Sequence, residues 1–219
     1  RDTDSLDELR RLGVTDTKIK LTADAVLTLA QADKVQGFKL LQNFNLSKDK
    51  PIVAISVRNW GSDDKYLQEM AKAADMLSKE KAAQIALLPL QYPADVVACK
   101  KLQQFMKAEA VILDTAFDTE QFLAIMGCFD LLIGMRLHAL VFAAVMGTPF
   151  IALSYDPKID GFVQEVEGTN IGAIESFAAS DLVKAAEKIL EQDNHSNDRL
   201  EQLRKKALEN TQLAFGLLK

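Results

Sequence analysis

From residue 51 onward, short apolar runs alternate with longer amphipathic stretches. The run PIVAISV at 51–57 is continuous and rich in β-branched residues, which is typical of a parallel strand buried on both faces. In the stretch that follows, Leu67, Met70, Ala74 and Leu77 share one helical face. The same alternation predicts strands at 51–57, 83–90, 108–115, 130–135, 149–155 and 170–176, and helices at 63–81, 94–107, 119–129, 136–147, 158–168, 179–191 and 197–217.

Strict alternation of strands and helices with short connections predicts a parallel sheet with right-handed crossovers, an α/β Rossmann-like domain. We assign this domain to residues 49–195, followed by a carboxyl-terminal helix within 196–219. Residues 1–48 are interpreted as the end of a preceding domain and a linker. In that part, 1–14 predicts an amphipathic helix, 18–30 a strand leading to a crossing segment, and 31–50 a polar, irregular linker.

Composition narrows the class of protein. The net charge of -5 argues against broad nucleic-acid binding, which requires phosphate neutralisation. Cys99 and Cys128 are the two cysteines, and their context shows no spacing suited to a metal, so we expect a reducing compartment and no structural zinc. No apolar run approaches the roughly 20 residues of a membrane span. Because Arg1 already lies in a helical pattern, we expect the sequence to be a fragment of a larger protein.

Chemically suited residues follow the predicted strands, and the carboxyl ends of parallel strands are where ligands bind. The strongest pair is Arg136 and His138 in GMRLHAL, at the start of a predicted helix. A helix start favours anions, arginine adds a fork for carboxylate or phosphate, and histidine adds an acid or base near neutral pH. The structural alternative is an arginine in a salt bridge and a histidine in the core.

Other candidates carry two interpretations each. Lys158 follows the fifth strand and can neutralise a phosphate, or be an exposed first-turn lysine beside Pro157. Asp156 and Asp160 can orient Lys158 or His138, although a helix cap is the simpler role for Asp156. Further side chains are Arg58 and Trp60, which can bind a sugar or base or pack between domains, and Gln91 and Asp95, which can bind hydroxyls or form a turn.

Several enzyme classes are disfavoured by missing motifs. The chain has no GxGxxG or GxxxxGK[ST] sequence, so the Rossmann-like pattern does not indicate a dinucleotide or P-loop site. It also lacks GxSxG, which argues against a hydrolase of the α/β type.

The run GMRLHALVFAAVMGTPFIALSYDPKIDGF at 134–162 resembles the polysaccharide pyruvyl transferase family, most closely its CsaB branch of bacterial cell-wall enzymes. The opening RDTDSLDELRRLGV resembles the family's RDxxSxxxLxxLGV segment, which lies about mid-chain. LTADAVLTL resembles an ADPVF-like stretch, with Ala25 where proline is usual. VAISVRNW and LLPLQYPAD resemble further segments, so the resemblance runs over nearly the whole chain.

The resemblance implies the carboxyl-terminal half of a two-domain GT-B-like fold, with a short piece of the preceding domain. It also implies transfer of the enolpyruvyl unit of phosphoenolpyruvate to a sugar, giving a pyruvate ketal and phosphate. In the CsaB branch the acceptor is a lipid-linked amino-sugar disaccharide, and the ketal later anchors surface-layer proteins. A cytoplasmic enzyme with peripheral membrane contact is therefore expected. The family's donor-binding Arg-Leu-His run maps onto Arg136, Leu137 and His138, with Lys158 and Arg1 as further candidates.

The implied chemistry agrees with the residues. Phosphoenolpyruvate carries about three negative charges near neutral pH and needs several cations or helix starts. Ketal formation needs a proton for the methylene carbon, which His138 can supply. This account needs no metal or other cofactor. Two alternatives remain: a GT-B glycosyltransferase that uses a nucleotide sugar, and a non-catalytic module that binds sugars or anions.

Overall fold

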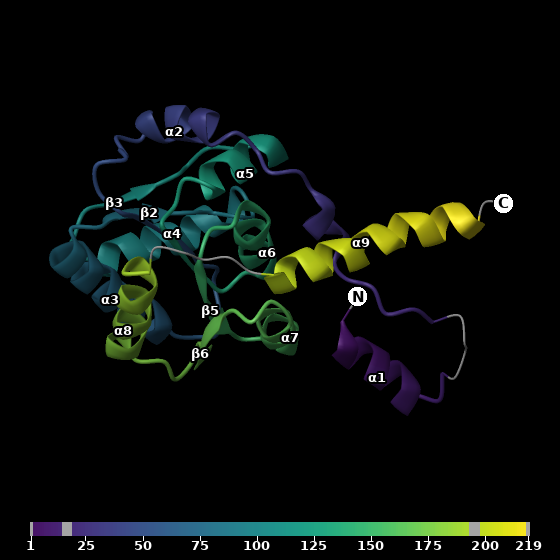
Figure 1. Ribbon diagram of the computed structural model, residues 1–219. Coiled ribbons are helices and arrows are strands. Elements are labelled where there is room, and N and C mark those ends of the chain that lie inside the picture. The colour runs from purple at the N-terminus through teal and green to yellow at the C-terminus, as the bar shows by residue number, and fades with distance from the viewer. Residues whose placement is uncertain (1, 15–18, 193–197, 218–219) are drawn as a thin grey trace.

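The sheet at the centre of the protein has six parallel strands in the order β3-β2-β1-β4-β5-β6 (Figure 1). The computed structural model describes residues 2–14, 19–192 and 198–217. The strands are β1 (Ile52–Ser56), β2 (Gln84–Leu87), β3 (Ala110–Ile112), β4 (Leu131–Gly134), β5 (Phe150–Ser154) and β6 (Thr169–Ala173). The α/β Rossmann-like prediction is confirmed.

Helices cover both faces of this sheet. They are α1 (Thr3–Arg11), α2 (Lys34–Gln42), α3 (Lys65–Lys81), α4 (Ala94–Phe105), α5 (Thr119–Met126), α6 (Leu137–Met146), α7 (Pro157–Glu165), α8 (Ala179–Leu190) and α9 (Asp198–Leu217), with a 3₁₀ turn, η1 (Ala25–Thr28). Alternate residues of β1 point to opposite faces: Ile52 and Ala54 pack with α5, α6 and α7, and Val53 and Ile55 with α3, α4 and α8. This two-sided burial explains the continuous apolar run.

Two predictions for the first fifty residues are wrong. The described residues of 18–30 form no strand; Leu27 is buried in η1, and the Asp24 carboxylate caps this turn by accepting from the Val26 N–H at 3.1 Å. The expected irregular linker contains α2, which Asp33 caps and which buries Leu41 against the core. These segments fold onto the sheet's own core, while the proposed domain limits at residues 48 and 195 stay predictions.

Helix α9 connects the end of the chain to its beginning. Leu203 and Ala207 are buried, and the Asn210 side chain accepts from Thr22 Oγ1 at 2.7 Å and donates to the Ala23 carbonyl at 2.9 Å. Beyond these contacts α9 extends away from the sheet (Figure 1), and its Phe215 is 64% exposed. Among the described helices, none is long and apolar enough to cross a membrane.

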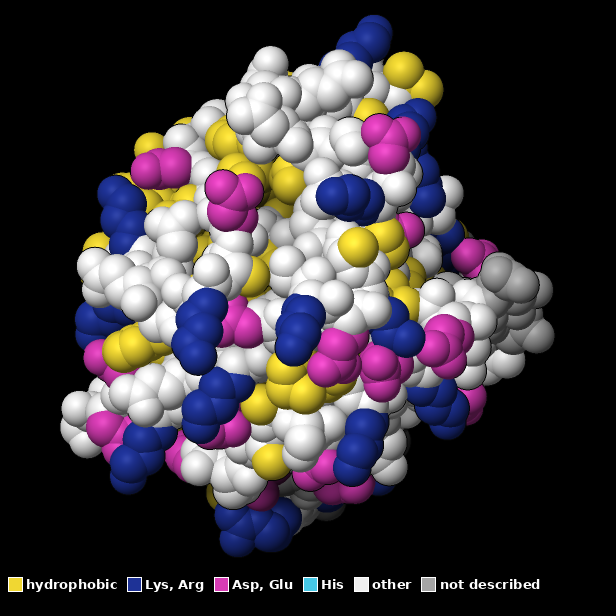
Figure 2. Space-filling model, turned by 90° about the vertical axis from the view of Figure 1, so that its left-hand side faces the viewer, with side chains coloured by type: hydrophobic (Ala, Val, Ile, Leu, Met, Phe, Trp, Pro, Cys, Tyr) yellow, Lys and Arg dark blue, Asp and Glu magenta, His cyan; other side chains and the backbone are white. Residues whose placement is uncertain are grey.

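Basic and acidic side chains are interspersed on the face that Figure 2 shows. Ion pairs account for part of this pattern: Lys81 Nζ lies 3.3 Å from a Glu187 carboxylate oxygen and 2.8 Å from one of Glu191, linking α3 to α8 and the residue after it. Exposed pairs of this kind contribute little to stability.

Candidate functional site

The predicted site residues meet at the carboxyl edge of the sheet. Because all strands run parallel, the segments after β1, β2, β4 and β5 emerge at the same edge. β5 lies directly beside β4, so Lys158 and Arg136 follow neighbouring strands. The central part of the edge therefore collects Arg58 and Trp60, Arg136 and His138, and Tyr155 to Lys158.

Arg136 is held by a buried carboxylate. It is the residue before α6, in an extended conformation, and its side chain is 15% exposed. Its Nη2 donates to Asp95, whose side chain is 2% exposed, and the second Asp95 oxygen accepts from the Gln91 N–H at 2.9 Å. Asp95, predicted for hydroxyl binding or a turn, instead positions Arg136. The Gln91 side chain is exposed, and its backbone serves this same arrangement.

His138 lies on the first turn of α6 and is exposed. Its ring centroid is 6.4 Å from that of Phe142, one turn along the helix. Leu137 between them is buried, so it offers a ligand its backbone N–H rather than its side chain. The first N–H groups of a helix lack intrahelical acceptors and attract anions. Of the two interpretations of His138, the core histidine is excluded by its exposure.

Lys158 lies on the first turn of α7 and is exposed. Asp156 caps this helix by accepting from the Lys158 N–H at 3.0 Å, and its other oxygen lies 3.0 Å from Lys158 Nζ. These contacts lower the pKa of the Asp156 carboxyl, chiefly through the backbone hydrogen bond. The capping prediction for Asp156 is confirmed. Asp160 accepts instead from Asn170 at 2.8 Å.

The amino-terminal segment approaches Lys158. Asp2 lines a small depression together with Leu137, Lys158, Phe162 and Glu165. Arg1, the further candidate from the family's RDxxS segment, lies outside the described residues. The position of Asp2 nevertheless brings the start of the described chain to the side of the edge where α6 and α7 begin.

Arg58 and Trp60 both contact Tyr155. Arg58 Nη1 donates to the Tyr155 hydroxyl at 3.1 Å, and the centroids of the Trp60 and Tyr155 rings are 4.4 Å apart. Trp60 Nε1 donates to Glu175, which follows β6, at 2.9 Å. Tyr155 and Glu175 were not singled out from the sequence as ligand-binding residues. Their only signal was their position at or after the ends of predicted strands.

Unpartnered polar atoms mark the same edge. Four side-chain atoms of the described residues are buried without a hydrogen-bond partner, and three of them, Ser56 Oγ, Arg58 Nε and Arg136 Nε, lie at or just after the ends of β1 and β4. Such groups are rare in proteins and tend to mark sites that bind something else. No cluster of three metal-binding side chains occurs within the described ranges.

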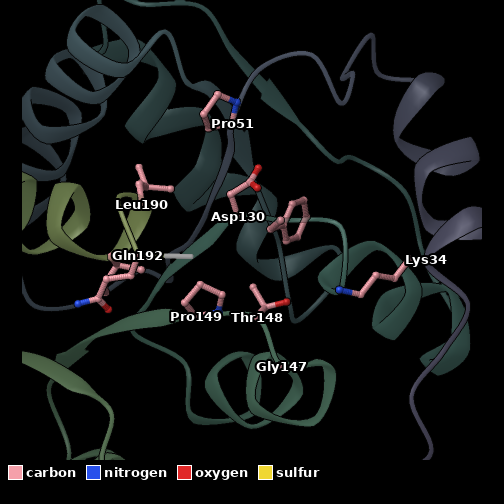
Figure 3. A pocket seen from close by; sticks show the side chains of 10 residues that line it. Lys34, Pro51, Asp130, Gly147, Thr148, Pro149, Leu190 and Gln192 are labelled. Carbon is pink, nitrogen blue, oxygen red and sulfur yellow. The ribbon is translucent and has the colours of Figure 1, made fainter. Parts of the chain in front are cut away.

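A pocket of about 370 Å³ lies at the opposite edge, where Pro51, Asp130 and Pro149 precede β1, β4 and β5 (Figure 3). Its Asp130 carboxylate already accepts from the Ile52 N–H at 2.7 Å. Lys34 reaches it from α2. The carboxyl edge, with its arginines and exposed histidine, offers far more chemistry.

Solved structures share the fold. This chain is similar to the UDP-GlcNAc 2-epimerase of Methanocaldococcus jannaschii, solved with UDP-GlcNAc and UDP, at 16% identity and a TM-score of 0.67 over 98% of this chain and 59% of that one. It is similar to S. aureus MnaA, solved with UDP, at 13% identity and a TM-score of 0.67, over 94% of this chain and 53% of that one. It thus spans little more than half of either protein.

A third structure is a separate domain. The carboxyl-terminal CMP-Kdo binding domain of WaaA from Acinetobacter baumannii matches at 14% identity and a TM-score of 0.52, over 80% of this chain and 96% of that one. These likenesses support a Rossmann-like domain of the GT-B type. No curated protein matches the sequence significantly.

The sequence itself identifies the family. The family model described as polysaccharide pyruvyl transferase matches residues 1–157, which include Arg136 and His138 as well as β1 to β5. The chain therefore belongs to the polysaccharide pyruvyl transferase family.

Proposed function

We propose that this chain carries the donor-binding part of an enzyme that transfers the pyruvyl group of phosphoenolpyruvate to a sugar as a cyclic ketal, releasing phosphate. The observation that carries the proposal is the first turn of α6, where an exposed histidine stands two residues after an arginine fixed by a buried carboxylate. Membership of the pyruvyl transferase family supports the reaction class.

The donor's charges fit this place. Arg136, Lys158 and the first N–H groups of α6 are three sources of positive potential for a carboxylate and a phosphate. Arg136 keeps an unpartnered Nε donor, and Lys158 is 48% exposed and free to turn from Asp156 towards a ligand. Arg1 is a further candidate of the family pattern. In this account no metal or other cofactor takes part.

His138 moves the protons. A sugar hydroxyl attacks C2 of the donor while His138 protonates C3, which turns the methylene into a methyl group. The imidazole then accepts the proton of the attacking hydroxyl. A second hydroxyl of the same sugar attacks C2 as the bond from C2 to the phosphate oxygen breaks. Its proton leaves with the phosphate, which completes the ketal.

The acceptor expected from the CsaB-like pattern is a lipid-linked amino-sugar disaccharide on the cytoplasmic face of the membrane. We propose this acceptor class for the whole enzyme, together with peripheral membrane contact and no role for nucleic acid.

A phosphate-release assay with the full-length enzyme, phosphoenolpyruvate and a panel of acceptor disaccharides tests the function. We expect release only when an acceptor is present. His138→Ala should lower the rate by about 10²–10⁴-fold, because general acid catalysis contributes that much, without lowering the melting temperature. Lys184→Ala, an exposed change on α8, is the matched control. If His138→Ala retained full transfer, the assignment of the acid would be wrong. A thermal shift with uridine nucleotides and none with phosphoenolpyruvate would favour a nucleotide-sugar glycosyltransferase.

A further inference from the structure

Arg58, Trp60, Tyr155 and Glu175 form a group at the carboxyl edge that the donor chemistry leaves unused; we call it the aromatic cluster. Its members come from the segments after β1, β5 and β6. Trp60 and Tyr155 are both partly exposed, as is Arg58, so the cluster keeps accessible aromatic and cationic surface.

The indole of Trp60 is fixed from several sides. Its ring packs on Tyr155 at 4.4 Å between centroids, and its Nε1 donates to Glu175 at 2.9 Å. The loop is also held by Tyr66, whose hydroxyl accepts from the Trp60 N–H at 3.2 Å and donates to the Arg58 carbonyl at 2.7 Å. A side chain ordered in advance loses little entropy when a ligand stacks on it.

Arg58 differs from the other cations of the edge. Arg136 is paired with Asp95 and Lys158 with Asp156, but among the residues whose placement is described no carboxylate forms an ion pair with Arg58. Its guanidinium carbon lies 5.3 Å from the Tyr155 ring centroid, and its Nε is buried without a hydrogen-bond partner. This arginine retains donors for an uncharged or anionic oxygen.

The aromatic cluster adjoins the donor-binding residues. β4 lies between β1 and β5, so the hydrogen bond from Arg58 to Tyr155 passes over the end of β4. There the Arg58 N–H contacts Met135 Sδ at 3.4 Å, one residue before Arg136. Tyr155 itself is followed directly by Asp156 and the start of α7.

We propose that the aromatic cluster is the subsite for the acceptor's sugar ring, which stacks on Trp60 while Arg58 and Glu175 bind its oxygen atoms. The inference rests on the proposed transfer to a sugar and adds where that sugar lies. An aromatic surface with a few fixed polar groups suits a ring that has one apolar face and a polar rim. Its position beside Arg136 would bring the acceptor's hydroxyls next to C2 of the donor.

Trp60 is the only tryptophan of this chain, so its emission reports on the subsite directly. The probe is N-acetylmannosamine, titrated into the 219-residue chain, with the open-chain alcohol sorbitol as the control that has hydroxyls and no ring face. We expect a saturable change in emission with the sugar and none with sorbitol. Equal responses to both, or no saturable response to the sugar, would overturn the subsite.

Kinetics of the full-length enzyme separate the two substrates. Trp60→Ala should raise the KM for the acceptor about tenfold, the scale of one lost aromatic contact, with the KM for phosphoenolpyruvate unchanged. Arg58→Gln should act in the same direction, and Trp60→Phe should restore most of the affinity because it keeps a ring on Tyr155. The control is Phe105→Ala, an exposed aromatic at the far end of α4. Melting temperatures show whether each variant is folded.

The two proposals fail in different ways. If the enzyme releases no phosphate from phosphoenolpyruvate with any acceptor while the sugar still alters Trp60 emission, the pyruvyl transfer is wrong and the sugar subsite stands. If release proceeds and folded Trp60→Ala and Arg58→Gln keep the parent KM for the acceptor, the subsite is wrong. A rise confined to the KM for phosphoenolpyruvate would also overturn it, because the cluster would then serve the donor.

Discussion

Arg136 and Asp95 show how the site balances a buried charge. The guanidinium is mostly buried, and the carboxylate beside it is almost wholly so. Because Asp95 offsets part of the arginine's charge, the arginine alone does not supply the potential that a trianionic donor needs. The first turn of α6 and Lys158 supply the remainder. Asp95 in turn sets the direction of the guanidinium, and so acts through Arg136.

A double-variant cycle tests this pairing through stability. Arg136→Met should lower the free energy of unfolding by about 3–5 kcal/mol, since it leaves Asp95 buried without its cation. Adding Asp95→Asn should recover much of that loss, because the amide removes the charge and can still accept from the Gln91 N–H. Urea unfolding of the parent, both single variants and the double variant measures the coupling. Additive effects would show that the two side chains do not stabilise one another.

The sequence was sufficient to bring Arg136, His138 and Lys158 to one edge, since each follows a strand of a parallel sheet. It was not sufficient to find the partner of Arg136. Asp95 is 41 positions away, and β1 lies between β2 and β4, so the segment after β2 must reach across the end of β1. Strand order sets that contact, and periodicity carries no information about strand order.

At the scale of elements, α2 depends on a close approach to α5. Gly37 is buried in α2, and a Cβ placed on it would lie 2.7 Å from Cys128 Sγ and closer still to the carbonyl of Ala124 in α5. The two helix backbones meet where this side chain is missing. A glycine in mid-helix weakens the local helical pattern, which is why residues 31–50 predicted a linker while the strands, marked by buried runs, were predicted correctly.

Gly37→Ala should therefore destabilise the protein by about 1–3 kcal/mol, the usual cost of overpacking a core. Gly216→Ala is the matched control: it is the same substitution near the end of α9, where nothing lies within 4 Å of the added carbon. That variant should be neutral or more stable by up to about 1 kcal/mol. Thermal unfolding of both variants measures the difference, and an unchanged melting temperature for Gly37→Ala would contradict the close contact.

At the scale of the whole molecule, segments from both ends of the chain meet on α7. Glu165, the last residue of α7, shares a depression with Asp2, and its backbone carbonyl accepts from Arg199 Nε of α9 at 3.0 Å. Asn210 of α9 also binds Thr22 and Ala23. The alternation of strands and helices predicts the sheet, but contacts between segments almost two hundred residues apart depend on how the ends return to it.

The charge of Glu165 makes this junction sensitive to pH. Burial raises the pKa of its carboxyl, the Asp2 carboxylate raises it further, and Lys206 and Arg199 oppose the shift. The folded protein therefore keeps the Glu165 proton to higher pH than the unfolded chain does. Its contribution to stability is largest below the unfolded pKa and is lost as the pH rises through the raised folded pKa. Glu165→Gln stays neutral, so it should melt higher than the parent at about pH 7 and near the parent at about pH 4. Glu80→Gln, an exposed change at the end of α3, should show no such difference between the two pH values. A Glu165→Gln protein that melted below the parent at neutral pH would mean that the ionised carboxylate stabilises the junction, and that Lys206 and Arg199 outweigh burial.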